Sequence, residues 1–379
     1  MAEGVFINKI EGFLPGEPVA NDEMEQYLGI IGGKKSRSKA IVLRNNGIKQ
    51  RYYALNKNSE PTYTNARLTA ESVKKVLSGK TKAEEIELLC CGTTSPDQLV
   101  PSHAVMVHGL LPELKNLQVV SFQAVCCSGM HALKHAFLSV LSGDAKNAIV
   151  SASERTSSLL KHQNFEEESK KLDQLETNPI IAFEKEFLRW MLSDGSASLL
   201  LETKPNDIGV SLKIEWIDNY SFANEAETCM YLGGEKYNGQ VKPWADHEVN
   251  EILEKSLLTF KQDVKLLDKN VVSLGGKAWE RTLKKHNLKA EEIDFYLPHI
   301  SSMYFADKVY AEMQNTGHVV PKDKWFFNLT QVGNVGAASI FLALEELLKS
   351  GKLKKGNKIF LSVPESARFS YSNALLTVY

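Results

Sequence analysis

Short apolar runs alternate with longer stretches whose apolar residues recur at helical spacing along most of this chain. Residues 88–91 form an uninterrupted apolar run, as a buried strand does, and helical spacing precedes it over residues 70–77. A second short run at 119–122 precedes apolar positions at helical spacing until Gly143 ends the pattern. Strands that alternate with helices predict an α/β protein with largely parallel sheets, covered by helices on both faces.

This alternation repeats within the chain. The sequence Lys-Ala-Glu-Glu-Ile stands at residues 82–86 and again at 289–293, an offset of 207, each time before an apolar strand. The same offset places Cys127 on Asn334, and both positions precede an apolar helix. Each helix leads to a strand that ends in Ser-x-x-Glu. Matched features in one order predict two copies of one α/β unit.

The duplication divides the chain into an N-terminal half, residues 1–205, and a C-terminal half, residues 206–379. In sheets covered on both faces, ligands gather beyond the carboxyl ends of the parallel strands. Cys127 and Asn334 open equivalent helices, and His299 directly follows a strand of the second half. If the halves pack about a pseudo-twofold axis, these three side chains meet in one pocket.

Cys127 is the candidate nucleophile. In the first turn of a helix, unpaired N–H groups and the positive end of the helix dipole favour a thiolate and offer donors to an oxyanion. The small residues Ser128 and Gly129 leave room for a thioester. A buried cysteine that only fills space explains this stretch equally well. Five cysteines, in two adjacent pairs and a single Cys229, predict reduced thiols rather than disulfides or a zinc site.

The balance of charged residues gives no indication of a nucleic-acid or membrane partner. Lys and Arg number 45 and Asp and Glu 46, so nothing favours binding to nucleic acid or to a membrane surface. We expect a cytosolic protein, because the chain has no start typical of a signal peptide and no apolar run that could span a bilayer.

A Cys, a His and an Asn in one pocket suit the formation of a carbon–carbon bond. The Cys takes an acyl group from a thioester. His299 and Asn334 donate hydrogen bonds to the carbonyl of a second thioester and stabilise the enolate that attacks the first. This is a Claisen condensation.

Seven groups of motifs follow one another along nearly the whole chain: Gly-Phe-Leu-Pro at 12–15 with Asn-Asp-Glu at 21–23, Asn-Gly-Ile-Lys-Gln-Arg at 46–51, Thr-Thr-Ser-Pro-Asp at 93–97 with Pro-Ser at 101–102, Cys-Ser-Gly at 127–129, Ser-Asp-Gly-Ser-Ala at 193–197, residues 294–299, and Gly-Asn at 333–334 with Ala-Ala-Ser at 337–339. In this order they resemble the β-ketoacyl-acyl carrier protein synthase III branch of the thiolase superfamily. The resemblance implies a duplicated, five-layered α-β-α-β-α fold and an obligate homodimer. It also implies acyl thioester substrates on acyl carrier protein or CoA, no metal or redox cofactor, and a triad of Cys127, His299 and Asn334.

Absent residues separate this chain from related families. Thiolases use a second cysteine near the C-terminus, and no cysteine follows Cys229. Hydroxymethylglutaryl-CoA synthases place a Glu in the segment that here spans 93–97. The Cys-His-Asn set therefore favours a ketosynthase.

The C-terminal loop departs from the family, which usually has a Gly-rich loop whose N–H completes the oxyanion hole. Here it reads Val-Pro-Glu-Ser-Ala-Arg at 363–368, and proline has no N–H to donate. Either Glu365 or Ser366 supplies the donor, or the pocket is shaped for another substrate. Glu365 is also a candidate base, which requires a raised pKa. A structural pair with Arg368 is an equally good interpretation.

Two further groups of residues are candidates for substrate binding. The aromatic residue that stacks on the adenine of CoA in many relatives has no counterpart at 40–44, which favours acyl carrier protein as donor. Within the basic run 34–51, Arg44 and Arg51 are candidates for the pantetheine phosphate, although such a run is more often a solvated face.

The acyl tunnel is expected along residues 128–131 and the insertion at 156–190. Phe183, Phe187 and Trp190 are candidates to line it, and at helical spacing they also fit a plain core.

The unusual loop and the insertion favour a ketosynthase of specialised lipid or polyketide synthesis, in particular of the dialkylresorcinol or flexirubin type. The initiating synthase III of fatty acid synthesis, and an acyltransferase to an oxygen or nitrogen nucleophile, are the alternatives. A catalytically silent partner is less favoured because the triad is complete. A cysteine hydrolase is disfavoured because Val125 stands where its nucleophile elbow needs Gly.

Overall fold

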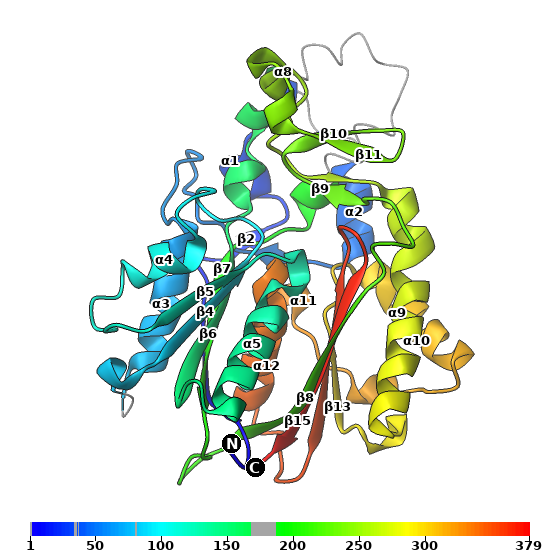
Figure 1. Ribbon diagram of the computed structural model, residues 1–379. Coiled ribbons are helices and arrows are strands. Elements are labelled where there is room, and N and C mark those ends of the chain that lie inside the picture. The colour runs from blue at the N-terminus through cyan, green and yellow to red at the C-terminus, as the bar shows by residue number, and fades with distance from the viewer. Residues whose placement is uncertain (1, 34–35, 37, 80–81, 168–186) are drawn as a thin grey trace.

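The computed structural model describes residues 2–33, 36, 38–79, 82–167 and 187–379, and its main elements stack in five layers (Figure 1). Two central helices lie between two blocks of strands, and two further pairs of helices cover the outer faces. The central helices are α5 (Ser128–Ser142) and α12 (Ser339–Lys349), and the outer ones are α3 (Asn65–Leu77) with α4 (His103–His108) and α9 (Val264–His286) with α10 (Ala306–Asn315). This is the α-β-α-β-α arrangement that the sequence predicts.

The two blocks of strands repeat one order and join into a nine-stranded sheet. Along the sheet the strands are β5 (Gln118–Phe122), β4 (Leu88–Thr93), β6 (Asn147–Glu154), β7 (Gly195–Glu202) and β1 (Phe6–Phe13), then β8 (Leu212–Ser221), β15 (Ser370–Val378), β14 (Lys358–Glu365) and β13 (Phe295–Pro298). The blocks meet where Phe6 and Ile7 of β1 pair with Lys213 and Leu212 of β8. The predicted boundary near residue 205 falls between β7 and β8.

The sheet is mixed, and the prediction of largely parallel strands is wrong. Only β4 with β5, β4 with β6, and β13 with β14 pair in parallel, whereas the other five neighbours in this sheet are antiparallel. An antiparallel neighbour needs only a short connection, such as residues 366–369 between β14 and β15. Helices cover both faces, so the apolar pattern of a buried strand does not reveal its direction.

The duplication is present, but its offset changes along the chain. Short 3₁₀ turns at Ala83–Glu85 and Ala290–Glu292 keep the offset of 207. The central helices begin at Ser128 and Ser339, an offset of 211. The serine hydroxyls accept equivalent hydrogen bonds, from the Ala124 amide at 2.8 Å and the Val335 amide at 2.9 Å.

The counterpart of Cys127 is therefore Ala338, and the predicted equivalence of Cys127 with Asn334 is wrong by four residues. The second half carries the extra residues before its turn, where the short helix α11 (Leu329–Val332) lies.

The starts of the two central helices approach each other closely. A Cβ atom on Gly129 would lie 2.7 Å from the Ala337 carbonyl oxygen and 2.9 Å from the Ala152 Cβ, so only glycine fits there. The largest hydrophobic cluster of the described residues surrounds these helices. This contact brings the two turns that carry the candidate chemistry to one place.

The remaining elements form a cap above one end of the sheet in Figure 1. They are α1 (Met24–Leu28), α2 (Lys39–Asn46), β2 (Val19–Ala20) with β3 (Gln50–Arg51), β9 (Met230–Tyr231) with β12 (Lys261–Gln262), β10 (Gly234–Tyr237) with β11 (Gln240–Pro243), and α8 (Val249–Glu254). Within the described ranges, no helix is long and apolar enough to cross a membrane.

Candidate active site

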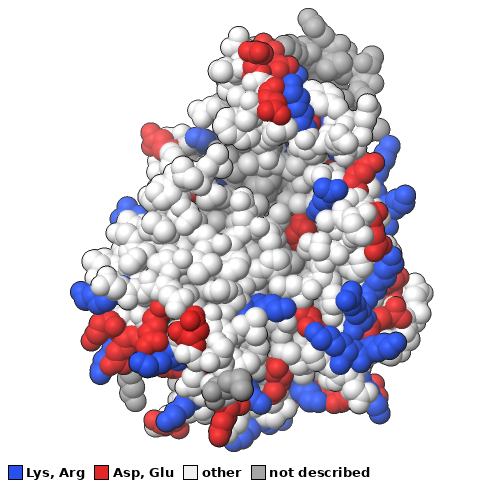
Figure 2. Space-filling model, viewed as in Figure 1, with Lys and Arg blue, Asp and Glu red and all other residues white. Residues whose placement is uncertain are grey.

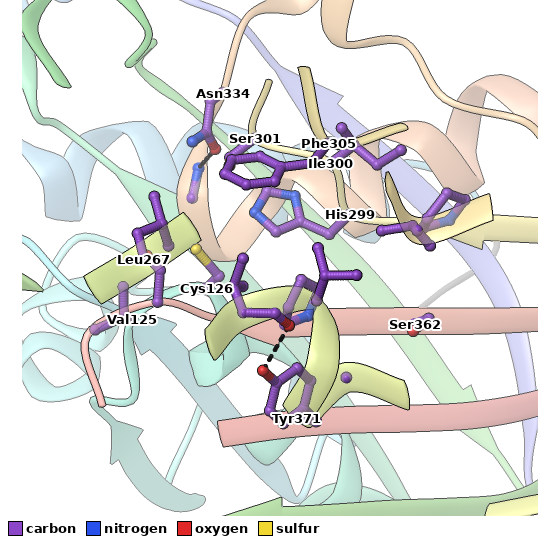
Figure 3. Close-up of a pocket in the computed structure, with 18 of the residues that line it drawn as sticks. Val125, Cys126, Leu267, His299, Ile300, Ser301, Phe305, Asn334, Ser362 and Tyr371 are labelled. Carbon is purple, nitrogen blue, oxygen red and sulfur yellow. Dashed lines mark hydrogen bonds between the residues drawn. The ribbon is translucent and has the colours of Figure 1, made fainter. Parts of the chain in front are cut away.

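A largely apolar cavity of about 120 Å³ brings together two of the three predicted triad residues. His299 and Asn334 line it, and Cys126 lines it in place of Cys127. Figure 3 shows the sulfur of Cys126 beside the imidazole of His299, with the side chain of Asn334 above them in this view. The predicted turn thus lies at this cavity, but the structure presents the neighbouring cysteine there.

The backbone conformation of this turn explains why Cys126, and not Cys127, faces the cavity. Val125 has a φ of +49°, which a β-branched residue rarely adopts, and it begins the 3₁₀ turn Val125–Cys127. The Ser128 hydroxyl donates to the Val125 carbonyl at 2.7 Å and accepts from the Ala124 amide, which fixes the turn. Cys126 faces the cavity, whereas the Cys127 sulfur is buried 3.3 Å from the Val363 carbonyl oxygen.

Neither thiol is in an environment that favours a thiolate. Burial raises the pKa of Cys126 and of Cys127, and the charge of Glu365 raises both further. The expectation of a favoured thiolate is therefore not met, because burial disfavours the charged form of both cysteines. Both cysteines are neutral thiols at rest.

His299 directly follows β13 and is held by its backbone, whose N–H donates to the Ser362 carbonyl at 2.8 Å. Its side chain is 6 % exposed, and its Nε2 has no hydrogen-bond partner among the described residues. Burial lowers the pKa of His299 to about 4, so the imidazole is neutral at pH 7. A buried nitrogen without a partner is costly in an empty site and is available to a ligand.

The backbone N–H and carbonyl groups of Asn334 are both hydrogen-bonded. Its N–H donates to the Met191 carbonyl at 3.2 Å, and its carbonyl accepts from the Ser193 amide at 2.9 Å. Its Oδ1 accepts from the Gly336 amide at 3.0 Å. This bond orients the amide group, so the Nδ2 donors remain for a substrate oxygen.

Two buried glutamates flank the cysteine turn. Glu154 lines the cavity and accepts hydrogen bonds from the backbone and hydroxyls of Thr94 and Ser95, and from the Ala337 amide at 3.3 Å. These bonds link the first half to the turn after Asn334, which indicates a structural role for Glu154.

Glu365 accepts from the backbone of its own loop, namely the amides of Ala367, Arg368 and Ser370. Burial raises its pKa, as the base hypothesis requires. The predicted side-chain pair with Arg368 does not form: the Arg368 Nε donates to the Ala226 carbonyl, and only its backbone N–H reaches Glu365. Three backbone amides are thus directed at this carboxylate, while Ser366 lines the cavity.

Comparison with known proteins gives a consistent family. A family model described as "3-Oxoacyl-[acyl-carrier-protein (ACP)] synthase III C terminal" matches residues 283–367. The β-ketoacyl-[acyl-carrier-protein] synthase III of Clostridium perfringens (strain SM101) is 27% identical over 357 residues, which cover 93% of this chain and 94% of that protein. The enzyme of the same name from Rickettsia prowazekii is 25% identical over 353 residues. This match covers 93% of this chain and 92% of that protein.

Among solved structures, AbyA1, a tetronic acid condensing enzyme, has a TM-score of 0.75 at 19% identity and covers 98% of this chain and 99% of its own. OleA of Xanthomonas campestris, solved with bound lauric acid and lauroyl-CoA, has a TM-score of 0.71 at 19% identity and covers 100% of both chains. Over nearly its whole length, the chain is similar to β-ketoacyl-[acyl-carrier-protein] synthase III enzymes, and its fold is that of AbyA1 and OleA.

The two arginines predicted to bind phosphate lie in different environments. Arg44 is exposed in the last turn of α2. Arg51 is fully buried, donates to the Asn21 Oδ1 at 2.6 Å and to the Trp190 carbonyl at 3.4 Å, and cannot reach a phosphate at the surface. The prediction that Arg51 binds phosphate is therefore wrong, because this residue is buried and joins segments of the cap.

Of the described residues that were predicted to line the acyl pocket, one lines the cavity and the other does not. Phe187 lines the cavity. Trp190 does not: it is fully buried in the hydrophobic cluster under the cap, with Arg189 over its ring. Phe183 lies outside the described residues. Spacing alone did not distinguish lining residues from core residues, because both are apolar and buried.

The sequence reasoning missed two features of the site. One is Cys126, which adjoins the predicted nucleophile and offered only the doubled cysteine as a signal. The other is a set of lining residues on α9 and α10, far from the insertion in sequence. Nothing in the motifs indicates that the cavity continues between these helices.

Proposed function

We propose that this enzyme joins two acyl thioesters by a Claisen condensation. One observation carries the proposal: a cysteine, the unpartnered Nε2 of His299 and the oriented amide of Asn334 meet at one apolar cavity. The synthase III-like fold supports it.

The reaction proceeds in two half-reactions on this site. A cysteine sulfur attacks the first thioester, a sulfur–acyl bond forms, and the carrier thiol leaves with the cysteine proton. The second thioester then loses carbon dioxide or an α-proton, and its enolate oxygen accepts hydrogen bonds from His299 and Asn334. The enolate carbon attacks the acyl group, and the cysteine sulfur leaves and regains a proton. No step needs a metal or a redox cofactor.

The neutral state of His299 suits this role. A neutral imidazole donates one hydrogen bond to the thioester oxygen and carries no charge that would attract water into the cavity. The resemblance assigns the acylated sulfur to Cys127, whereas the cavity is lined by Cys126. Acylation of the Cys126→Ala and Cys127→Ala variants separates these two assignments.

The carrier is proposed to be acyl carrier protein, with Arg44 at the phosphate. Carrier proteins are acidic, and Lys and Arg side chains gather on the face of the molecule along the α9 side in Figure 2. We also propose a homodimer, in line with the family resemblance.

The specialised role is a synthesis of the dialkylresorcinol type, in which the condensed product closes a ring. The non-glycine loop at 363–368 and the likeness to AbyA1, a tetronic acid condensing enzyme, support it. The initiating synthase III of fatty acid synthesis is the second candidate, since the curated relatives carry that name.

The test offers paired thioesters to the enzyme and identifies the product by mass spectrometry. Acetyl-CoA with malonyl-carrier protein tests the initiating role, and a β-ketoacyl with a medium-chain acyl thioester tests the ring-forming role. A cyclised product with the second pair supports the specialised role. A linear product with the first pair supports the initiating role, and no carbon–carbon bond with either pair refutes the condensation.

A further inference from the structure

The cavity continues past His299 into the C-terminal half, away from the insertion that the sequence predicts as the acyl tunnel. α9 and α10 lie side by side on the outer face of the sheet (Figure 1) and contact each other. Their inward residues line this part, which we call the C-terminal arm: Val271, Val272, Gly275, Ala278 and Trp279 of α9, with Val309 and Met313 of α10.

The far end of this arm is apolar. Trp279 is 5 % exposed, and its Nε1 donates to the His318 carbonyl at 3.0 Å, which fixes the ring against β13 and β14. Met313, 4 % exposed, lies beside it in the same hydrophobic cluster. The end of the arm is thus closed by a rigid indole ring and a flexible thioether. The thioether can adjust to the end of a ligand, whereas the indole ring limits how far the ligand extends.

Glycines keep the entrance of the arm open. A Cβ atom on Gly275 would lie 3.2 Å from a ring carbon of Tyr371, and one on Gly276 would lie 2.5 Å from the Glu312 carboxylate. The Tyr371 hydroxyl donates to the Val271 carbonyl at 2.7 Å, drawn as the dashed line in Figure 3, and so ties β15 to α9 beside the entrance. Larger side chains at these positions would fill the path from the cysteine to Trp279.

A second group of apolar residues lines the opposite side of the reaction centre, including Phe187, Met191 and Leu192. The centre thus has mostly apolar walls in two directions, with Glu312 of α10 as a charged residue in the lining, and a condensation brings two acyl groups to it. The cavity of about 120 Å³ is similar to the roughly 150 Å³ of an apolar cavity that holds benzene. That size suits an acyl chain of short or medium length.

We propose that the C-terminal arm binds the alkyl chain of one of the two acyl thioesters, and that Trp279 and Met313 set its maximum length. This inference rests on the proposed condensation. It names the substrate class of the arm as a short- or medium-chain acyl group.

The experiment fills the arm from α10 and compares a matched substitution on the same helix. Val309→Phe places a ring in the arm, whereas Ala311→Phe places the same ring on the exposed face of α10. Wild type and both variants receive acyl thioesters of increasing chain length. Intact mass reports the acyl-enzyme, and product mass reports the condensed chain.

We expect Val309→Phe to shorten the longest chain accepted, in the acyl-enzyme or in the product, with at least a tenfold loss for that chain and no loss for an acetyl group. Ala311→Phe should match wild type. Met313→Ala should extend the accepted length, which separates a tunnel from a general loss of packing.

Unchanged chain preference in both Val309→Phe and Met313→Ala, with wild type condensing normally, would overturn the arm and leave the condensation intact. A wild-type enzyme that neither becomes acylated nor forms product would instead refute the proposed function. The two failures are thus distinguishable.

Discussion

Cys126 and Cys127 are adjacent, yet their sulfur atoms face different surroundings. Cys126 lines the cavity opposite His299, and Cys127 lies fully buried against the Val363 carbonyl oxygen, 3.3 Å away. The positive φ of Val125 begins the turn that separates them. The orientation of one short turn therefore determines which thiol a substrate meets.

The first prediction concerns acylation. In this geometry, Cys126→Ala abolishes the acyl adduct that acyl thioesters leave on wild type, and Cys127→Ala retains it. Peptide mapping after incubation with an acyl thioester panel measures both. An adduct on Cys127 that survives Cys126→Ala would show instead that the turn rearranges when substrate binds, and that the resemblance assigns the nucleophile correctly.

The second prediction concerns the dependence of folding stability on pH. The pKa of His299 is about 4 in the folded protein and about 6.5 in an unfolded chain, so the unfolded state binds more protons between these values. Stability should fall as the pH drops below 6.5, by about 2 kcal/mol from this residue between pH 7.5 and pH 5.

Urea unfolding at the two pH values should show a smaller pH-dependent loss for His299→Asn, because asparagine does not titrate. An equal loss in variant and wild type would mean that His299 is not buried in its neutral form.

The third prediction concerns the C-terminal loop. Glu365→Ala removes the acceptor of the Ala367, Arg368 and Ser370 amides and should lower the free energy of unfolding by about 3 kcal/mol. Glu365→Gln keeps one acceptor oxygen and should lower it by less than half as much.

Condensation rates across pH then distinguish a base from a structural group. If Glu365 is a base, Glu365→Gln removes the limb of the pH profile that reports it, while a structural role leaves the shape of that profile unchanged.

The fourth prediction compares the two arginines. Arg51→Met leaves the Asn21 Oδ1 without the Arg51 donor and the Trp190 carbonyl with only the Asn46 Nδ2 donor, and should reduce stability by about 2–4 kcal/mol. Arg44→Ala should leave the melting temperature unchanged and raise the KM for the carrier-bound substrate several-fold. Thermal unfolding and steady-state kinetics separate these effects, and an unaltered KM for Arg44→Ala would remove Arg44 from the docking face.

Much of the fold followed from local pattern. The apolar run of β4 and the helical spacing of α5 predict those elements correctly, because each residue's burial follows from the period of its own segment. The matched motifs also indicated the duplication. Strand direction did not follow, because a strand buried on both faces, such as β6, looks the same in either direction.

For the candidate site, too, the sequence indicated some positions and not others. His299 follows a strand and Asn334 precedes a helix start, and the contact of the two halves through Gly129 and Ala337 brings their turns together as the duplication implies. Arg51 and Trp190 show the opposite case. Both belong to segments that the sequence places near the site, but the packing of the cap buries them.

By itself the sequence indicated the layered α/β fold, the resemblance to synthase III, and the turns and strand end that carry the candidate site residues, since these depend on local patterns and on motif order. Only the tertiary structure decided which of two adjacent cysteines faces the cavity, which arginine stays exposed, and that the cavity continues between α9 and α10. These features depend on one strained turn and on contacts between distant segments, and no local pattern records such contacts.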